Sequence, residues 1–116
     1  MKMTVAQVLV RFLKEAGVRH IFGVSGHSIF DLTDAIYLEP GIDLVSAQIE
    51  ISAAYMASAH SRALRAPSAC LASAGAGATN LVTGVAQAFK ESAPVLVISS
   101  IGSVTSSTFG RSKLAQ

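Results

Sequence analysis

The sequence predicts an α/β protein in which a mainly parallel sheet lies between two layers of helices. Short apolar segments alternate along the chain with segments whose apolar residues recur at helical spacing, and glycine or proline separates them. Strands that alternate with helices pair in parallel, because each helix carries the chain back across the sheet before the next strand begins. We therefore expect a three-layer α/β/α domain.

Four segments are predicted as helices. In the first, Thr4 and Gln7 can form a capping box, and Gly17 can end the helix. Pro40 with Gly41 ends the second helix, and Pro67 marks the end of the third, which is rich in alanine and serine. The predicted helices cover residues 4–16, 29–38, 51–64 and 78–90.

The predicted strands cover residues 20–24, 42–46, 68–72 and 95–99. The last of them is apolar almost throughout, as is typical of a parallel strand buried on both faces. After Ser100 the chain becomes polar, and its final stretch, 109–116, carries no stop signal. We therefore expect one domain, residues 1–116, that is incomplete at its carboxyl end.

The composition indicates that part of this domain's surface is covered by another subunit or by further domains. Of the 116 residues, 51% are hydrophobic and only 14% are charged, against about 25% charged in an average soluble protein. A small domain has a large surface for its volume, so we expect a homo-oligomer or further domains of the same protein. The alternative is a small hydrophobic monomer.

Several classes of function have little support. The net charge is only +2 and the basic residues are scattered, which argues against nucleic-acid binding. Cys70 is the single cysteine, so no disulfide framework exists. The chain begins with an amphipathic helix and its apolar runs are short, which predicts neither a signal peptide nor a membrane span. A cytoplasmic protein is the expectation.

Three features are expected at the carboxyl edge of the sheet, where open parallel sheets bind ligands. They are the turn Val24–Ser28, Glu50 and the loop Ala74–Asn80. Glu50 has uncharged neighbours, and a carboxylate in such surroundings can exchange a proton near neutral pH. The alternative is a solvated glutamate at a helix N-terminus, stabilised by the helix dipole.

The glycine-rich loop does not fit a dinucleotide site. Asn80 stands where the third glycine of that fingerprint belongs, and no acidic residue follows Glu91. The loop either lets a ligand approach closely or is a tight strand-to-helix turn. His27 is either a site residue or a solvated turn residue. His20 and His60 are interpreted as structural, and one cysteine with three scattered histidines predicts no metal site.

Four stretches of the chain resemble the N-terminal pyrimidine-binding domain of thiamine-diphosphate-dependent enzymes of the acetolactate synthase, pyruvate oxidase and benzoylformate decarboxylase type. The third, which ends in Gly-Ala-Thr-Asn-Leu-Val-Thr-Gly, is highly specific. The four stretches are Gly17–Gly26, Ala47–Ala57, Cys70–Gly84 and Ser92–Ile98.

This resemblance implies a thiamine-diphosphate-binding fold and an enzyme, a lyase or transferase, that acts on 2-oxo acids. Glu50 matches the family's glutamate, which bonds the aminopyrimidine ring and favours the imino tautomer that activates the thiazolium carbon. The resemblance further implies that His27 and Ser28 lie near the substrate. It also implies that the pyrimidine pocket is lined by Ser25, Gly26, Glu50, Gly75, Ala76, Gly77 and Asn80.

The resemblance also implies what this chain lacks. The family's diphosphate and Mg²⁺ motif, Gly-Asp-Gly followed by Asn, is absent, so a diphosphate-binding domain outside this chain should hold them. This chain alone should then be inactive. The enzyme should be a dimer or tetramer, and FAD is a further possible cofactor. Ile49, Ala76 and Ser25 replace the usual His, Pro and Pro. The alternative is therefore a catalytically degenerate relative with an assembly or regulatory role.

Overall fold

The computed structural model describes residues 2–101, so the expectation for residues 109–116 lies outside the described range. The elements follow one another in the alternating order that the sequence predicts. They are α1 (Val5–Glu15), β1 (His20–Gly23), a 3₁₀ turn η1 (His27–Ile29), α2 (Phe30–Leu38), β2 (Asp43–Ser46), α3 (Glu50–Leu64), β3 (Ser68–Ala72), α4 (Ala76–Asn80), α5 (Val82–Lys90) and β4 (Val95–Ser99).

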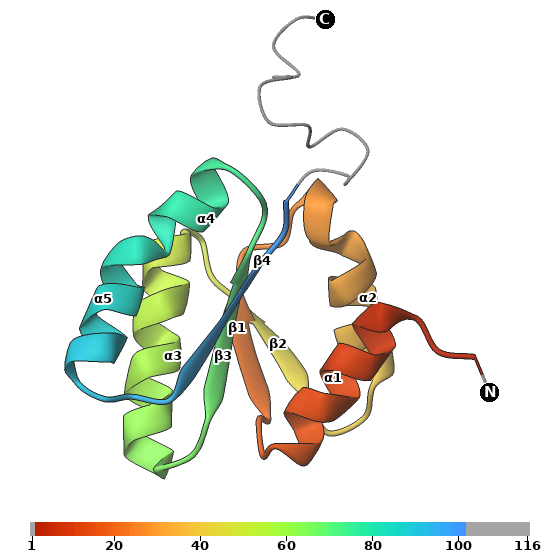
Figure 1. The fold of residues 1–116 in the computed structure, drawn as a ribbon, viewed down its shortest axis with the longest axis horizontal. Helices are drawn as coiled ribbons and strands as arrows, with labels where there is room; N and C mark the ends of the chain where they lie inside the picture. Colours follow the sequence, from red (N-terminus) through yellow and green to blue (C-terminus); the bar gives the residue numbers. More distant parts are fainter. Residues whose placement is uncertain (1, 102–116) are drawn as a thin grey trace, which may run out of the picture.

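The four strands form one parallel sheet in the order β2-β1-β3-β4. Helices α1 and α2 cover one face, and α3, α4 and α5 cover the other (Figure 1). Each face has its own apolar core. Leu13, Ile36 and Leu71 belong to the first, and Phe22, Ala57 and Leu81 belong to the second. The predicted three-layer α/β/α fold is confirmed.

The start and the end of α1 follow the predicted signals. The Thr4 hydroxyl accepts from Gln7 N–H, and the Gln7 side chain accepts from Thr4 N–H, which completes the capping box. Gly17 has φ of 95°, a left-handed conformation that favours glycine, directly after the helix. Val10 and Leu13 are the buried residues of this helix.

The predicted helix 78–90 is wrong in its start and its continuity. The helix begins earlier, at Ala76, and divides at Leu81 into α4 and α5. Leu81 N–H donates to the carbonyl of Ala78, a tight i→i+3 bond, and its side chain is only 1% exposed. Burying that side chain redirects the chain, so the glycine-rich segment becomes a short helix of its own.

The prediction that the last strand is buried on both faces is also wrong. β4 lies at the edge of the sheet, where Leu96 is 44% and Val97 is 38% exposed. These two side chains point to opposite faces, because Leu96 pairs with Ala69 and Val97 with Cys70. An apolar sequence indicates that a strand is suited to burial, but it does not show which elements cover the strand. Residues 2–101 leave β4 without a neighbour on one side.

Cys70 lies in the centre of β3 and is fully buried. Burial raises the pKa of its thiol to about 11, so the sulfur stays protonated at neutral pH. This placement agrees with an inert core residue. No helix within residues 2–101 has the length and apolar character needed to cross a bilayer.

Glu39 joins α1 to the end of α2 through two ion pairs. Its carboxylate accepts from Lys14 Nζ at 2.8 Å and from Arg11 Nε at 3.4 Å. The hydrogen bond from Lys14, with a smaller effect of Arg11, holds the pKa of Glu39 below its ordinary value of 4.5.

We expect the Glu39 ion pairs to contribute stability that is lost in acid. A lowered folded-state pKa means that the contribution is complete above the unfolded-state pKa and disappears as the pH falls through the folded-state value. Urea unfolding of the wild type and of Glu39→Gln should therefore differ at neutral pH and converge below about pH 4. A difference that stays constant across that range would contradict the ion-pair interpretation. The exposed carboxylate variant Glu15→Gln serves as the control.

Candidate functional site

The carboxyl ends of β1, β3 and β4 and the start of α3 meet at one edge of the sheet, at the top of Figure 1. Hydrogen bonds connect the turns that follow these strands. Ala74 N–H donates to Ser28 Oγ at 3.0 Å, and Ser99 Oγ donates to the carbonyl of Ser73 at 3.4 Å. The structure thus brings together the turn after β1, Glu50 and the glycine-rich loop, as the sequence predicted.

Glu50 is the first residue of α3 and is half-buried. Asn80, at the end of α4, donates from Nδ2 to Glu50 Oε2 at 3.1 Å. The carboxylate therefore has features of both sequence interpretations. It lies in the first turn of a helix, where the dipole favours negative charge, and it faces the glycine-rich segment.

Two glycines allow close packing beside Glu50. A Cβ on Gly77 would lie 3.3 Å from Glu50 Oε1 and 3.0 Å from Ser73 Oγ. A Cβ on Gly26 would lie 2.7 Å from the Cβ of Ser73, closer than real side chains approach. Gly75 has φ of 75°, which favours glycine, and is the residue directly before α4. Gly26 and Gly77 thus let the turn after β1, Ser73 and Glu50 pack closely, while Gly75 is exposed and has nothing within 4 Å of the position of a Cβ.

The carboxylate of Glu50 keeps capacity for a further hydrogen bond. An ionised carboxylate can accept about four hydrogen bonds, and Asn80 is its one donor among residues 2–101. Oε1 lies beside Gly77, where a Cβ would come within 3.3 Å of it. A ligand with an N–H or protonated ring nitrogen fits this donor and acceptor pattern.

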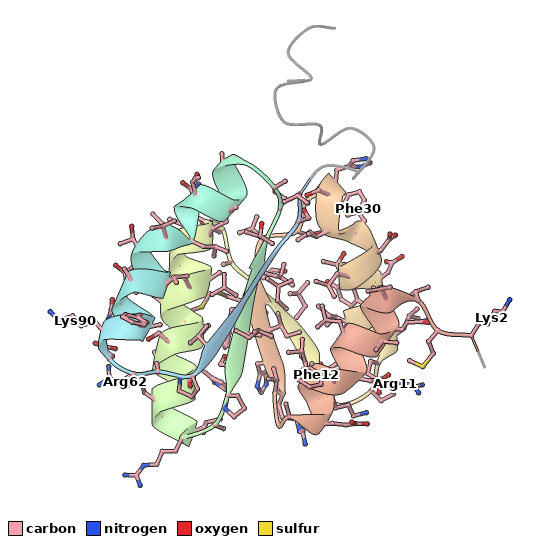
Figure 2. The ribbon with its side chains drawn as sticks, in the orientation of Figure 1. Lys2, Arg11, Phe12, Phe30, Arg62 and Lys90 are labelled. Atoms are coloured by element: carbon pink, nitrogen blue, oxygen red, sulfur yellow. The ribbon has the colours of Figure 1, made fainter. Side chains whose placement is uncertain are left out.

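His27 and Ser25 lie at the exposed rim of the site. The His27 ring packs edge-to-face on Phe30, with ring centroids 5.4 Å apart. Figure 2 shows Phe30 beside the start of α2, at the edge where the site lies. The structure places His27 next to the site without joining it to Glu50, so its role as a substrate residue stays a prediction.

Sequence reasoning missed the serines that frame the site. Ser73 follows β3 and fills the space between Gly26 and Gly77, while Ser100 follows β4 and donates to Ser28 Oγ at 2.7 Å. It also missed the contact between Asn80 and Glu50. The available signal was a serine directly after two apolar strands, at positions that a parallel sheet carries to the same edge.

His20 and His60 lie apart from this site. Their rings pack edge-to-face at 5.0 Å, and Phe22 packs against His60 at 5.3 Å. Both contacts agree with the structural interpretation. Within residues 2–101, no three side chains of His, Cys, Asp or Glu gather closely enough to hold a metal ion.

Comparison with known proteins gives a consistent result. Residues 3–113 match the family model described as "Thiamine pyrophosphate enzyme, N-terminal TPP binding domain". The acetolactate synthase large subunit of Buchnera aphidicola subsp. Acyrthosiphon pisum is 39% identical over 105 residues, and isozyme 3 of Escherichia coli K12 is 38% identical over 105. Each alignment covers 90% of this chain. Acetolactate synthase of Arthrospira platensis is 38% identical over 112 residues, or 94% of the chain.

The chain is short beside these relatives. It spans 18% of the length of the two large subunits and 19% of the Arthrospira platensis protein. The similarity therefore concerns one part of each relative.

Proposed function

Because this chain belongs to the family of thiamine pyrophosphate enzyme N-terminal TPP binding domains, we propose that it supplies the pyrimidine-binding part of an enzyme that acts on 2-oxo acids. The proposed reaction is carboligation of the acetolactate synthase type or decarboxylation. Thiamine diphosphate, when bound, supplies an electron sink at the reacting carbon.

The position of Glu50 carries this proposal. Its carboxylate lies at the carboxyl edge of the sheet, is half-buried, and lies against Gly77, where a Cβ would come within 3.3 Å of Oε1. A carboxylate with one free oxygen in this position can hold a proton between itself and a ring nitrogen of a bound pyrimidine. Asn80 keeps the carboxylate oriented by donating to the other oxygen.

The remaining residues of the proposed pocket orient the ring rather than react with it. Gly75 is exposed and has nothing near the position of a Cβ, so a flat ring could lie against its backbone. Gly26 and Gly77 let the neighbouring turns pack closely. Ser25, Ala76 and Asn80 line the same segments, and His27 with Ser28 would face the substrate at the rim.

The proposal requires partners for this chain. A diphosphate-binding domain outside these residues would hold Mg²⁺ and the diphosphate, and a second subunit would cover the exposed side of the site. Ile49, directly before Glu50, is 52% exposed. Covering such apolar surface is favourable by about 25 cal/mol per Å², which supports a homo-oligomer of the pyrimidine domain.

A titration of thiamine diphosphate into the ¹⁵N-labelled chain tests the binding part of the proposal. We expect amide shift changes to concentrate at Gly26, Glu50, Gly75 and Gly77, because these residues border the proposed pocket. Amides at the opposite end of the sheet, such as those of Val18 and Ala66, serve as internal controls. Thiamine monophosphate should shift the same amides, because the pyrimidine ring is common to both ligands.

The outcome separates two candidate functions. Saturable shifts at these residues support the cofactor site. No binding of thiamine diphosphate by this chain joined to the diphosphate-binding part of a relative would contradict the cofactor site. That result would favour the degenerate relative, which the replacement of the usual His and Pro by Ile49 and Ala76 supports.

A further inference from the structure

The Ser28 hydroxyl connects three turns that lie far apart in the sequence. Its Oγ accepts from Ala74 N–H at 3.0 Å and from Ser100 Oγ at 2.7 Å. Ser28 itself belongs to η1, after β1, while Ala74 follows β3 and Ser100 follows β4. One side chain therefore ties together the carboxyl-end turns of the two central strands and one edge strand.

The bond to Ala74 anchors the glycine-rich turn. Ala74 directly precedes Gly75, whose φ of 75° and ψ of −123° begin α4 without any side-chain cap. From there the chain leads within a few residues to Gly77 and Asn80, the two residues that contact Glu50. Movement at Ala74 would therefore change the distance between the turn and the carboxylate.

A second contact makes the arrangement tight. Gly26, two residues before Ser28, leaves less space toward Ser73 than a Cβ requires. The turn after β1 thus touches the turn after β3 at two neighbouring points, once by packing and once by a hydrogen bond. Both contacts hold residues Ser73 and Ala74, which directly precede Gly75.

We propose that Ser28 is a positioning residue, whose hydroxyl sets the place of residues 74–77 opposite Glu50 and thereby the width of the proposed cofactor pocket. This inference rests on the proposed function and assigns Ser28 a role different from the substrate contact that the sequence resemblance implies. Ser100 supports the same hydroxyl from the end of β4.

Amide hydrogen exchange of Ser28→Ala tests the positioning directly and needs no ligand. We expect exchange at Ala74 N–H to become about three- to tenfold faster, because its acceptor is removed. Ser28→Thr keeps a hydroxyl and should restore most of the protection. Ser46→Ala is the matched control, because Ser46 is exposed and its hydroxyl has no partner within residues 2–101.

The titration with thiamine diphosphate is then repeated on the same variants. Ser28→Ala should bind about three- to tenfold more weakly, and both Ser28→Thr and Ser46→Ala should bind nearly as the unaltered chain does. Unchanged exchange at Ala74, or faster exchange with unchanged affinity, would overturn the role of Ser28. If this chain joined to the diphosphate-binding part of a relative fails to bind, the proposed function is overturned instead, and the exchange result separates the two cases.

Discussion

Glu50→Gln is expected to lower turnover by about 10²- to 10⁴-fold, the usual contribution of one positioned proton-transfer group. Glutamine has nearly the same shape, so it preserves the packing at the start of α3 and can still accept a bond from Asn80. Its amide cannot take up and return a proton at neutral pH. The loss should therefore appear in kcat, with smaller changes in ligand affinity.

A chimeric enzyme makes this turnover measurable. The matching 105 residues of the Escherichia coli isozyme 3 large subunit, 38% identical to this chain, would be replaced by the corresponding segment of this protein. Acetolactate formation is then assayed with and without Glu50→Gln. Glu15→Gln removes the same charge from the exposed side of α1 and should leave turnover unchanged.

The possible failures of this experiment have different meanings. A folded chimera that is inactive without any substitution would favour the degenerate relative. Equal activity of the chimeras with and without Glu50→Gln would remove Glu50 from the mechanism. If the chimera does not fold, the titration of Glu50→Gln in the 116-residue chain decides whether the carboxylate contributes to binding.

Gly84→Ala is expected to destabilise the fold by about 1–3 kcal/mol, the range for overpacking a tight core. A Cβ on Gly84 would clash with the Cβ of Ala54 and lie 3.2 Å from the backbone of α3. Carbon atoms prefer separations of about 3.5–4.0 Å, so α5 would have to move away from α3. The gain of about 1 kcal/mol in helix propensity offsets only part of this cost.

A double-mutant cycle isolates this contact. Ala54→Gly removes the methyl group that Gly84→Ala would meet, so the double variant should be more stable than the sum of the two single changes predicts. Urea unfolding of all four proteins gives the coupling. If the two single changes in unfolding free energy simply add, then α3 and α5 accommodate the extra methyl group without strain. Ala86→Gly, at an exposed position of α5, gives the propensity effect alone.

The sequence could predict the alternation of elements and most of their boundaries, because local signals determine them. Thr4 with Gln7 and the glycine at position 17 gave the limits of α1, and the apolar run Ser68–Ala72 matched β3. The neighbourhood of Glu50 followed from the rule that parallel strands carry their carboxyl ends to one edge.

Two features could not be predicted, because they depend on contacts between distant residues. The division between α4 and α5 arises where Leu81 enters the core, and periodicity alone gives no sign of it. The exposure of β4 depends on its place in the strand order. The serines at positions 73 and 100 looked like ordinary turn residues until their partners were known, and Ser28 was expected only to lie near the substrate.

The parallel sheet has a consequence for how this chain folds. Each pairing joins residues far apart: about 23 positions from β1 to β2, about 48 from β1 to β3 and about 27 from β3 to β4. No pair of these strands can therefore form as a local hairpin. The chain must lose loop-closure entropy before the hydrogen bonds and packing of a strand pair can stabilise it. Chains dominated by such non-local contacts fold slowly. Of the four described strands, the apolar strand β4 is made last, and the edge that residues 2–101 leave unpaired should be open to other chains during folding.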